Sequence, residues 1–108
     1  MSNERLVYLD NNATTRVAPE VVEAMLPCLT EHWGNPSSAY DLANAPARMI
    51  ETARGQVALL IGTEPRNIIF TGCGTESNNT AIQSALFCNP TKRHVITSAV
   101  EHSANIKL

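Results

Sequence analysis

Residues 67–77, which read NIIFTGCGTES, decide the fold class of this chain. The β-prone run at 67–71 predicts a strand, and the glycines that follow predict a tight turn. A helix is expected over 76–87, with its apolar stripe facing inward: Ala81, Ile82, Ala85 and Leu86. A strand, a glycine-rich turn and a helix in this order begin a βαβ unit, so the pattern predicts an α/β fold.

The sequence after this helix completes the unit. Asn89-Pro90 should break the helix, and residues 94–97, HVIT, predict a second strand of the buried type. Ser103 is a candidate cap for a further helix that runs to Leu108. Because two strands cannot close a parallel sheet, we interpret the chain as part of a larger protein and expect it to fold poorly alone.

Two helices are expected before the decisive stretch. A short strand at 6–9 and a polar connection at 10–15 come first. The first helix should cover 18–33, with a kink at Pro27. The second should cover 40–61, beginning after Pro46 or bending there, and Gly62 is a plausible C-terminal cap.

The composition excludes several classes of protein. The chain has 108 residues, a formal net charge of −2 and scattered basic residues, so no basic face is expected to bind nucleic acid. No apolar run approaches the roughly 20 residues needed to span a membrane. The N-terminus does not resemble a secretory signal. Three cysteines without a C-x-x-C pair predict neither a disulfide framework nor a zinc site, and they favour a cytoplasmic location.

The turn before the helix is a candidate phosphate site. A helix start at the carboxyl end of a strand offers unpaired N–H groups and a partial positive charge. Gly74 allows close approach of an anion, and Thr75 adds a hydroxyl donor. The turn is not a Walker loop, because that loop's spacing and lysine are missing. It is not a dinucleotide fingerprint either, because Ser77 stands where the third glycine would be. The residues alone leave two interpretations open, a phosphate site or a tight start of the helix.

His102 follows the second strand of the same unit. Parallel strands end at the same edge of a sheet, so His102 is expected near Gly74 and Thr75. Its imidazole could stack on a planar ring or carry a proton near neutral pH. The other interpretation is a solvent-exposed loop histidine. Cys73 has no partner base nearby in sequence and is interpreted as a small packing residue.

Four motifs carry a family resemblance. They are YLDNNATT at 8–15, GNPSS at 34–38, FTGCGTESNN at 70–79 and EHSA at 101–104. In order and spacing they resemble the N-terminal part of NifS/IscS-type cysteine desulfurases of the class V aminotransferase family, over nearly the whole chain. The sequence at 73–82 is more similar to the nitrogen-fixation branch than to the housekeeping branch.

The resemblance implies a homodimeric fold-type I pyridoxal-phosphate enzyme with a parallel or mixed sheet and flanking helices. Residues 1–15 would associate with the small domain, and residues 16–108 would form the first part of the large cofactor-binding domain. Gly74 and Thr75 would bind the cofactor phosphate. His102 would be the catalytic residue, stacking on the pyridine ring and moving protons, and residues 11–13 would lie near the active site.

The implied reaction removes sulfur from L-cysteine, giving L-alanine and an enzyme persulfide. The sulfur would pass to an iron–sulfur scaffold protein, for clusters such as those of nitrogenase. In this family the Schiff-base lysine and the nucleophilic cysteine lie further along the chain. Lys92, Lys107 and the three cysteines do not match those motifs, so the 108 residues alone are expected to be inactive.

Two alternatives remain open at this point. A selenocysteine lyase, a sulfinate desulfinase or another fold-type I enzyme would share the early motifs. A small α/β phosphate- or nucleotide-binding module without catalysis would share the turn alone.

Overall fold

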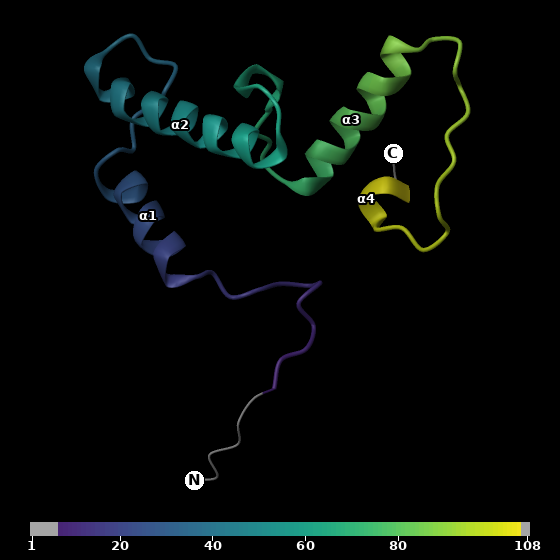
Figure 1. Cartoon of the computed structure of the whole chain (residues 1–108), viewed down its shortest axis with the longest axis horizontal. Coiled ribbons are helices and arrows are strands. Elements are labelled where there is room, and N and C mark those ends of the chain that lie inside the picture. Colours follow the sequence, from purple (N-terminus) through teal and green to yellow (C-terminus); the bar gives the residue numbers. More distant parts are fainter. Residues whose placement is uncertain (1–6, 107–108) are drawn as a thin grey trace. The chain divides into compact units, whose positions relative to one another are not determined.

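The structure, a computed structural model, describes residues 7–106. Within this range the chain forms four α-helices and two short 3₁₀ helices (Figure 1). It divides into two compact units, Met1–Pro65 and Arg66–Leu108.

Helix α1 (Pro19–Thr30) begins as the sequence predicts and ends earlier. Pro19 occupies the first turn, where its missing N–H is not needed, and Glu20 suits the positive end of the helix dipole. The helix ends at Thr30, before the predicted limit at Trp33. The loop that follows is stabilised locally, because the N–H of Ser37 donates to the side-chain Oδ1 of Asn35 at 2.9 Å.

The second helical segment begins with a 3₁₀ turn, η1 (Asp41–Ala43), which leads into α2 (Asn44–Ile61). Pro46 lies in the first turn of α2, where its missing N–H costs no hydrogen bond. Of the two alternatives predicted at Pro46, a helix start after this residue was therefore wrong, since α2 begins at Asn44. Gly34 is required beside this turn, because a Cβ at residue 34 would lie 2.4 Å from the carbonyl oxygen of Leu42.

Helix α2 ends at Gly62, which confirms the predicted cap. Gly62 has a φ of 70°, in the left-handed region that favours glycine. The N–H of Thr63 donates to the carbonyl oxygen of Ala58 at 2.9 Å, as in a Schellman motif.

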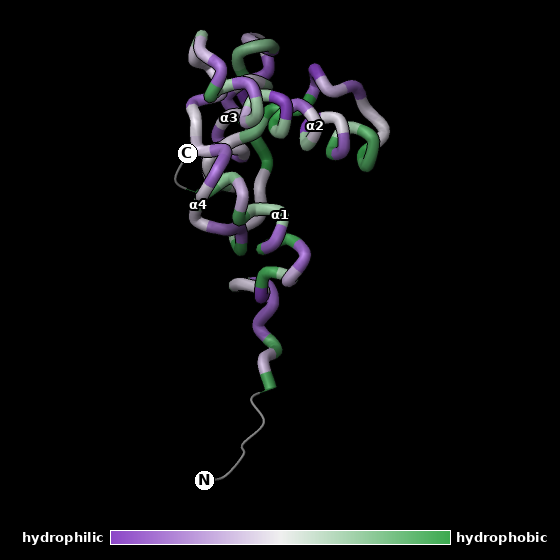
Figure 2. The backbone as a smooth tube through the Cα atoms, turned by 90° about the vertical axis from the view of Figure 1, so that its left-hand side faces the viewer, coloured by the Kyte–Doolittle hydropathy of each residue, from purple (hydrophilic) through white to green (hydrophobic). Residues whose placement is uncertain are grey.

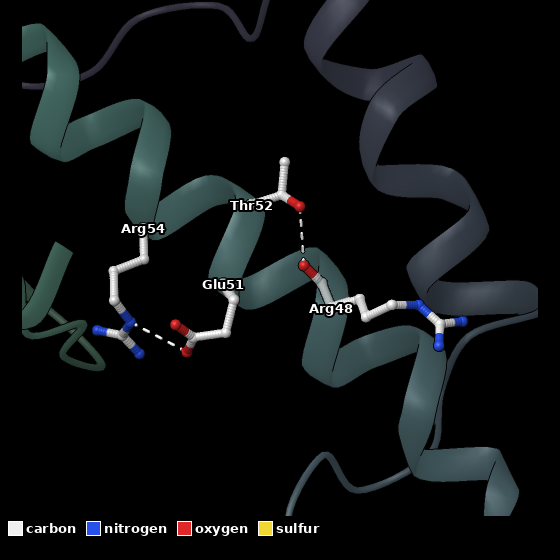
Figure 3. A network of polar contacts seen from close by, with 4 residues as sticks. All are labelled: Arg48, Glu51, Thr52 and Arg54. Atoms are coloured by element: carbon white, nitrogen blue, oxygen red, sulfur yellow. Dashed lines mark hydrogen bonds and ion pairs between the residues drawn. The ribbon is translucent and has the colours of Figure 1, made fainter.

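Figure 3 shows polar contacts on α2, including an ion pair of 3.1 Å between Arg54 Nε and Glu51 Oε1. Such a pair stabilises a helix by about 0.2–0.5 kcal/mol.

The second unit contains α3 (Gly74–Cys88) and α4 (Ser103–Ile106). A short 3₁₀ helix, η2 (Pro65–Asn67), spans the boundary between the units. Helix α3 begins two residues before the predicted start and ends before Asn89, as expected. Ile82 and Leu86 are half-buried, whereas Ala81 and Ala85 are exposed, so only part of the predicted inward stripe is confirmed. From the end of α3 the chain runs through a long loop into α4, which packs on α3 (Figure 1).

The predicted sheet is not confirmed. No residue between Val7 and Ile106 is assigned to a strand, including those of the stretches expected at 67–71 and 94–97. Asn67 belongs to η2 instead. Of the stretch expected at 6–9, Leu6 lies outside the described residues and the rest has no regular structure. A strand exists only when its backbone pairs with a neighbour, and the described segments lack that pairing.

The described residues bury few apolar side chains. Those that are buried are small: Ala43, Pro46, Ala58 and Ala104. Large apolar side chains on both units remain exposed, among them Leu29 at 72%, Phe87 at 87% and Ile96 at 89%. Figure 2 shows hydrophobic stretches alternating with hydrophilic ones along the chain. In the part of the chain that is described, no helix combines the length and apolar character needed to cross a bilayer.

Candidate functional site

A network of hydroxyl groups shapes the turn that precedes α3. The Oγ1 of Thr71 lies 2.5 Å from the Oγ of Ser77 and donates to the carbonyl oxygen of Cys73 at 3.2 Å. The Oγ of Ser77 lies 3.3 Å from the same carbonyl. The residues on both sides of the glycines are therefore held together by the side chains of Thr71 and Ser77.

The first turn of α3 presents free amide donors. The first intrahelical bond is donated by the N–H of Ser77 to the carbonyl oxygen of Cys73 at 3.1 Å. The N–H groups of Gly74, Thr75 and Glu76 come before it and have no acceptor within the helix. The N-cap residue, Cys73, makes no side-chain hydrogen bond to the helix. These donors suit an anion such as a phosphate.

Gly74 leaves space in front of these donors. A Cβ built at residue 74 would meet no atom within 4 Å. Its φ is not positive, since Gly62 is the one glycine with a positive φ in the described range. Neither the backbone conformation nor the packing of the described residues therefore requires a glycine at 74. A ligand that approaches the backbone closely would require one.

Glu76 is tied back to the turn. Its Oε2 accepts a hydrogen bond from the N–H of Gly72 at 2.6 Å. This bond resembles the reciprocal half of a capping box, displaced by one residue. The carboxylate therefore uses the amide of Gly72 and leaves those of Gly74 and Thr75 free.

His102 lies immediately before α4 with its ring exposed. The N–H of Ala104 donates to its Nδ1 at 3.1 Å. A backbone N–H can only donate, so Nδ1 acts as the acceptor and Nε2 carries the proton of the neutral ring. The imidazole thereby caps α4 through Nδ1, and Nε2 is left for another partner.

A hydrogen bond between side chains far apart in sequence links α3, which begins at Gly74, to α4, which His102 caps. The Nδ2 of Asn78 on α3 donates to the Oδ1 of Asn105 on α4 at 2.9 Å. Asn78 follows Gly74 by four residues, so both lie on the same face of α3, one turn apart. Helix α4, which His102 caps, is therefore attached to the face of α3 that begins with Gly74.

Sequence reasoning missed Glu76, Asn78 and Asn105 as structural partners of the site. The acidic residue at the third helical position is a recognised signal of a helix start, and it could have identified the role of Glu76. The pair of Asn78 and Asn105 has no such signal, because 27 residues separate them.

Residues 11–13 belong to the other unit and form a turn of their own. The N–H of Ala13 donates to the carbonyl oxygen of Asp10 at 3.1 Å. The hydroxyl of Tyr8 lies 2.7 Å from the carbonyl oxygen of Asp10 and 3.1 Å from that of Thr14. This turn is therefore formed by local bonds.

Comparisons with known proteins agree with the motifs. The family model described as "Aminotransferase class-V" matches residues 7–108. The chain is 55% identical over 103 residues to cysteine desulfurase 2 of Trichormus variabilis, covering 95% of this chain and 26% of that protein. It is 52% identical over 103 residues to the cysteine desulfurase NifS of Azotobacter vinelandii, covering 94% and 26%. It is 48% identical over 104 residues to the cysteine desulfurase IscS of Methanosarcina thermophila, covering 95% and 26%. The chain thus spans about a quarter of the length of these relatives.

Proposed function

Since the chain belongs to the class-V aminotransferase family, we propose that its first turn of α3 binds the phosphate of pyridoxal 5′-phosphate in a cysteine desulfurase. The observation that carries the proposal is the start of α3. Three amide donors, an exposed threonine hydroxyl and an open space at Gly74 meet there without a capping side chain. These features fit a phosphate group by charge, by hydrogen bonding and by space.

In this proposal each site residue has a separate task. The N–H of Gly74 and the hydroxyl of Thr75 hold the phosphate, and the dipole of α3 contributes about 0.3–1 kcal/mol to its binding. His102 lies against the cofactor ring and holds or moves a proton at Nε2, because Nδ1 is used by the N–H of Ala104. When bound, the cofactor supplies an electron sink for bond cleavage at the amino-acid substrate.

The proposal extends to the whole protein. Its substrate is L-cysteine and its products are L-alanine and a protein persulfide, whose sulfur goes to an iron–sulfur scaffold protein. The relatives named cysteine desulfurase, at 48–55% identity, support this substrate. We further propose a cytoplasmic homodimer in which residues 1–15 join a smaller domain and residues 16–108 begin the larger one. The resemblance to the nitrogen-fixation branch makes nitrogenase clusters the favoured destination of the sulfur.

A titration of the whole protein with pyridoxal phosphate tests the proposal. We expect a new absorbance band in the near-visible range that disappears on borohydride reduction, and release of alanine from L-cysteine. A selenocysteine lyase would give the same band but prefer selenocysteine. Absence of the band, with binding of a nucleotide instead, would contradict the proposal and favour a non-catalytic phosphate-binding module.

The two donors can be separated within this experiment. Thr75→Ser keeps the hydroxyl and should bind the cofactor within about threefold of the natural protein. Thr75→Val removes the hydroxyl at similar volume and should weaken binding by about tenfold, the effect of losing one hydrogen bond to a charged group.

A further inference from the structure

Three polar side chains form a continuous connection between α3 and the segment that carries His102. Asn78 Nδ2 donates to Asn105 Oδ1 at 2.9 Å, and Asn105 Nδ2 donates to Glu101 Oε2 at 3.0 Å. We refer to Asn78, Asn105 and Glu101 as the Asn105 relay. It begins one turn along α3 from Gly74 and ends at the residue next to His102.

The centre of the relay requires an amide. The side-chain amide of Asn105 accepts from Asn78 through its Oδ1 and donates to Glu101 through its Nδ2. A carboxylate at this position could accept from Asn78 but would face the carboxylate of Glu101. Glu101 and Asn105 are both half-buried, so water screens such a repulsion only in part.

Helix α4 is too short to be stable alone and depends on contacts with α3 for its position. It has only four residues, Ser103–Ile106, whereas isolated helices shorter than about 12 residues are marginal in water. Ala104 is its buried residue, and the relay supplies a side-chain hydrogen bond between Asn105 and Asn78 on α3. The ring of His102 is in turn fixed to α4 through the N–H of Ala104.

We propose that the Asn105 relay is a positioning device for His102. The inference rests on the proposed function, in which His102 lies against the cofactor ring. The relay residues do not touch the substrate or cofactor. They hold α4, and with it the imidazole, against the Gly74 face of α3, so that the proton-carrying Nε2 keeps a constant place.

The decisive test is an exchange of donor and acceptor in the whole protein. Asn105→Asp keeps the size and the acceptor for Asn78 but removes the donor to Glu101. We expect kcat for L-cysteine to fall by about tenfold, as for a misplaced catalytic group. KM and cofactor affinity should stay within about twofold, because Gly74 and Thr75 are untouched. The circular dichroism band of the bound cofactor should also change, since it reports the group that lies on the ring.

The matched variants follow from the same geometry. Glu101→Gln keeps an acceptor oxygen for Asn105 and should behave like the natural protein. The double variant Asn105→Asp with Glu101→Gln restores one hydrogen bond with its direction reversed, and kcat should return to within about threefold. If Asn105→Asp proves unstable, Asn78→Ala removes only the exposed end of the relay and should still lower kcat measurably.

A readout without cofactor separates this inference from the proposed function. The ring resonances of His102 in NMR spectra of the cofactor-free protein should shift in Asn105→Asp and return in the double variant. An unchanged kcat and unchanged resonances in Asn105→Asp, or a loss that Glu101→Gln does not relieve, would overturn the relay. A natural protein without a cofactor band would overturn the proposed function, while the NMR comparison would still test the relay.

Discussion

At the scale of single residues, the described fold does not require a glycine at residue 74, whereas a ligand bound close to its backbone would. An alanine at 74 would have an allowed backbone conformation and open space around its Cβ. Alanine also favours helix more than glycine does. If the added methyl group weakens cofactor binding, the cause would therefore be a clash with a ligand in this space.

We expect Gly74→Ala in the whole protein to weaken binding of pyridoxal phosphate by about tenfold or more, in line with the roughly 1–3 kcal/mol cost of overpacking a close contact. The thermal midpoint of the cofactor-free protein should stay equal or rise slightly. Gly55→Ala is the matched control, because a Cβ there also meets nothing within 4 Å and it lies on α2. Normal cofactor affinity in Gly74→Ala would mean that the phosphate lies elsewhere.

At the scale of elements, the helix boundaries follow from residues whose backbone preferences are local. Pro19 begins α1, Gly62 ends α2 and Asn89 follows the end of α3, all as the sequence predicts. Helix α3 starts earlier than predicted because Gly74 and Thr75, interpreted as turn residues, adopt helical geometry. Local chemistry thus predicts boundaries set by proline, asparagine or a glycine cap, but not the start of α3 among glycines or the end of α1 at Thr30.

Strands and long-range side-chain pairs are not determined locally. Residues 68–71 and 94–97 have the composition of strands, but a strand also requires a neighbour with which its backbone pairs. The candidate site divides in the same way. The sequence motifs predict Gly74, Thr75 and His102 as site residues. The role of Asn105 can be inferred only from its hydrogen bonds to Asn78 and Glu101 in the structure.

The cap of α2 gives a prediction at this scale. Gly62→Ala should lower the free energy of unfolding of the whole protein by about 1–2 kcal/mol, the cost of a left-handed conformation for a residue with a Cβ. No atom lies within 4 Å of a Cβ at 62, so the cost is conformational and not steric. Denaturant unfolding measures it, with Gly55→Ala as a control expected to be neutral or stabilising by up to about 1 kcal/mol. An equally stable Gly62→Ala protein would contradict the left-handed geometry.

At the scale of the whole molecule, the described residues carry more apolar surface than they bury. The buried apolar side chains are three alanines and one proline, which together offer little hydrophobic stabilisation. Leu59 and Leu60 on α2 are 83% and 84% exposed, and Val100 before α4 is 91% exposed. Conformational entropy of about 1–2 kcal/mol per ordered residue opposes folding, and small buried alanines cannot offset it.

Residues 1–108 produced alone should therefore lack a cooperative thermal transition. We expect far-ultraviolet circular dichroism to show partial helix that melts gradually, because α2 and α3 are long enough for marginal helix formation. The dye ANS should fluoresce strongly on the exposed apolar side chains, and pyridoxal phosphate should give no saturable band. Increasing protein concentration should produce association, since these side chains would then bury one another. A sharp, concentration-independent melt without ANS binding would contradict this prediction. It would show that the described helices bury their large apolar side chains against one another and form a stable core.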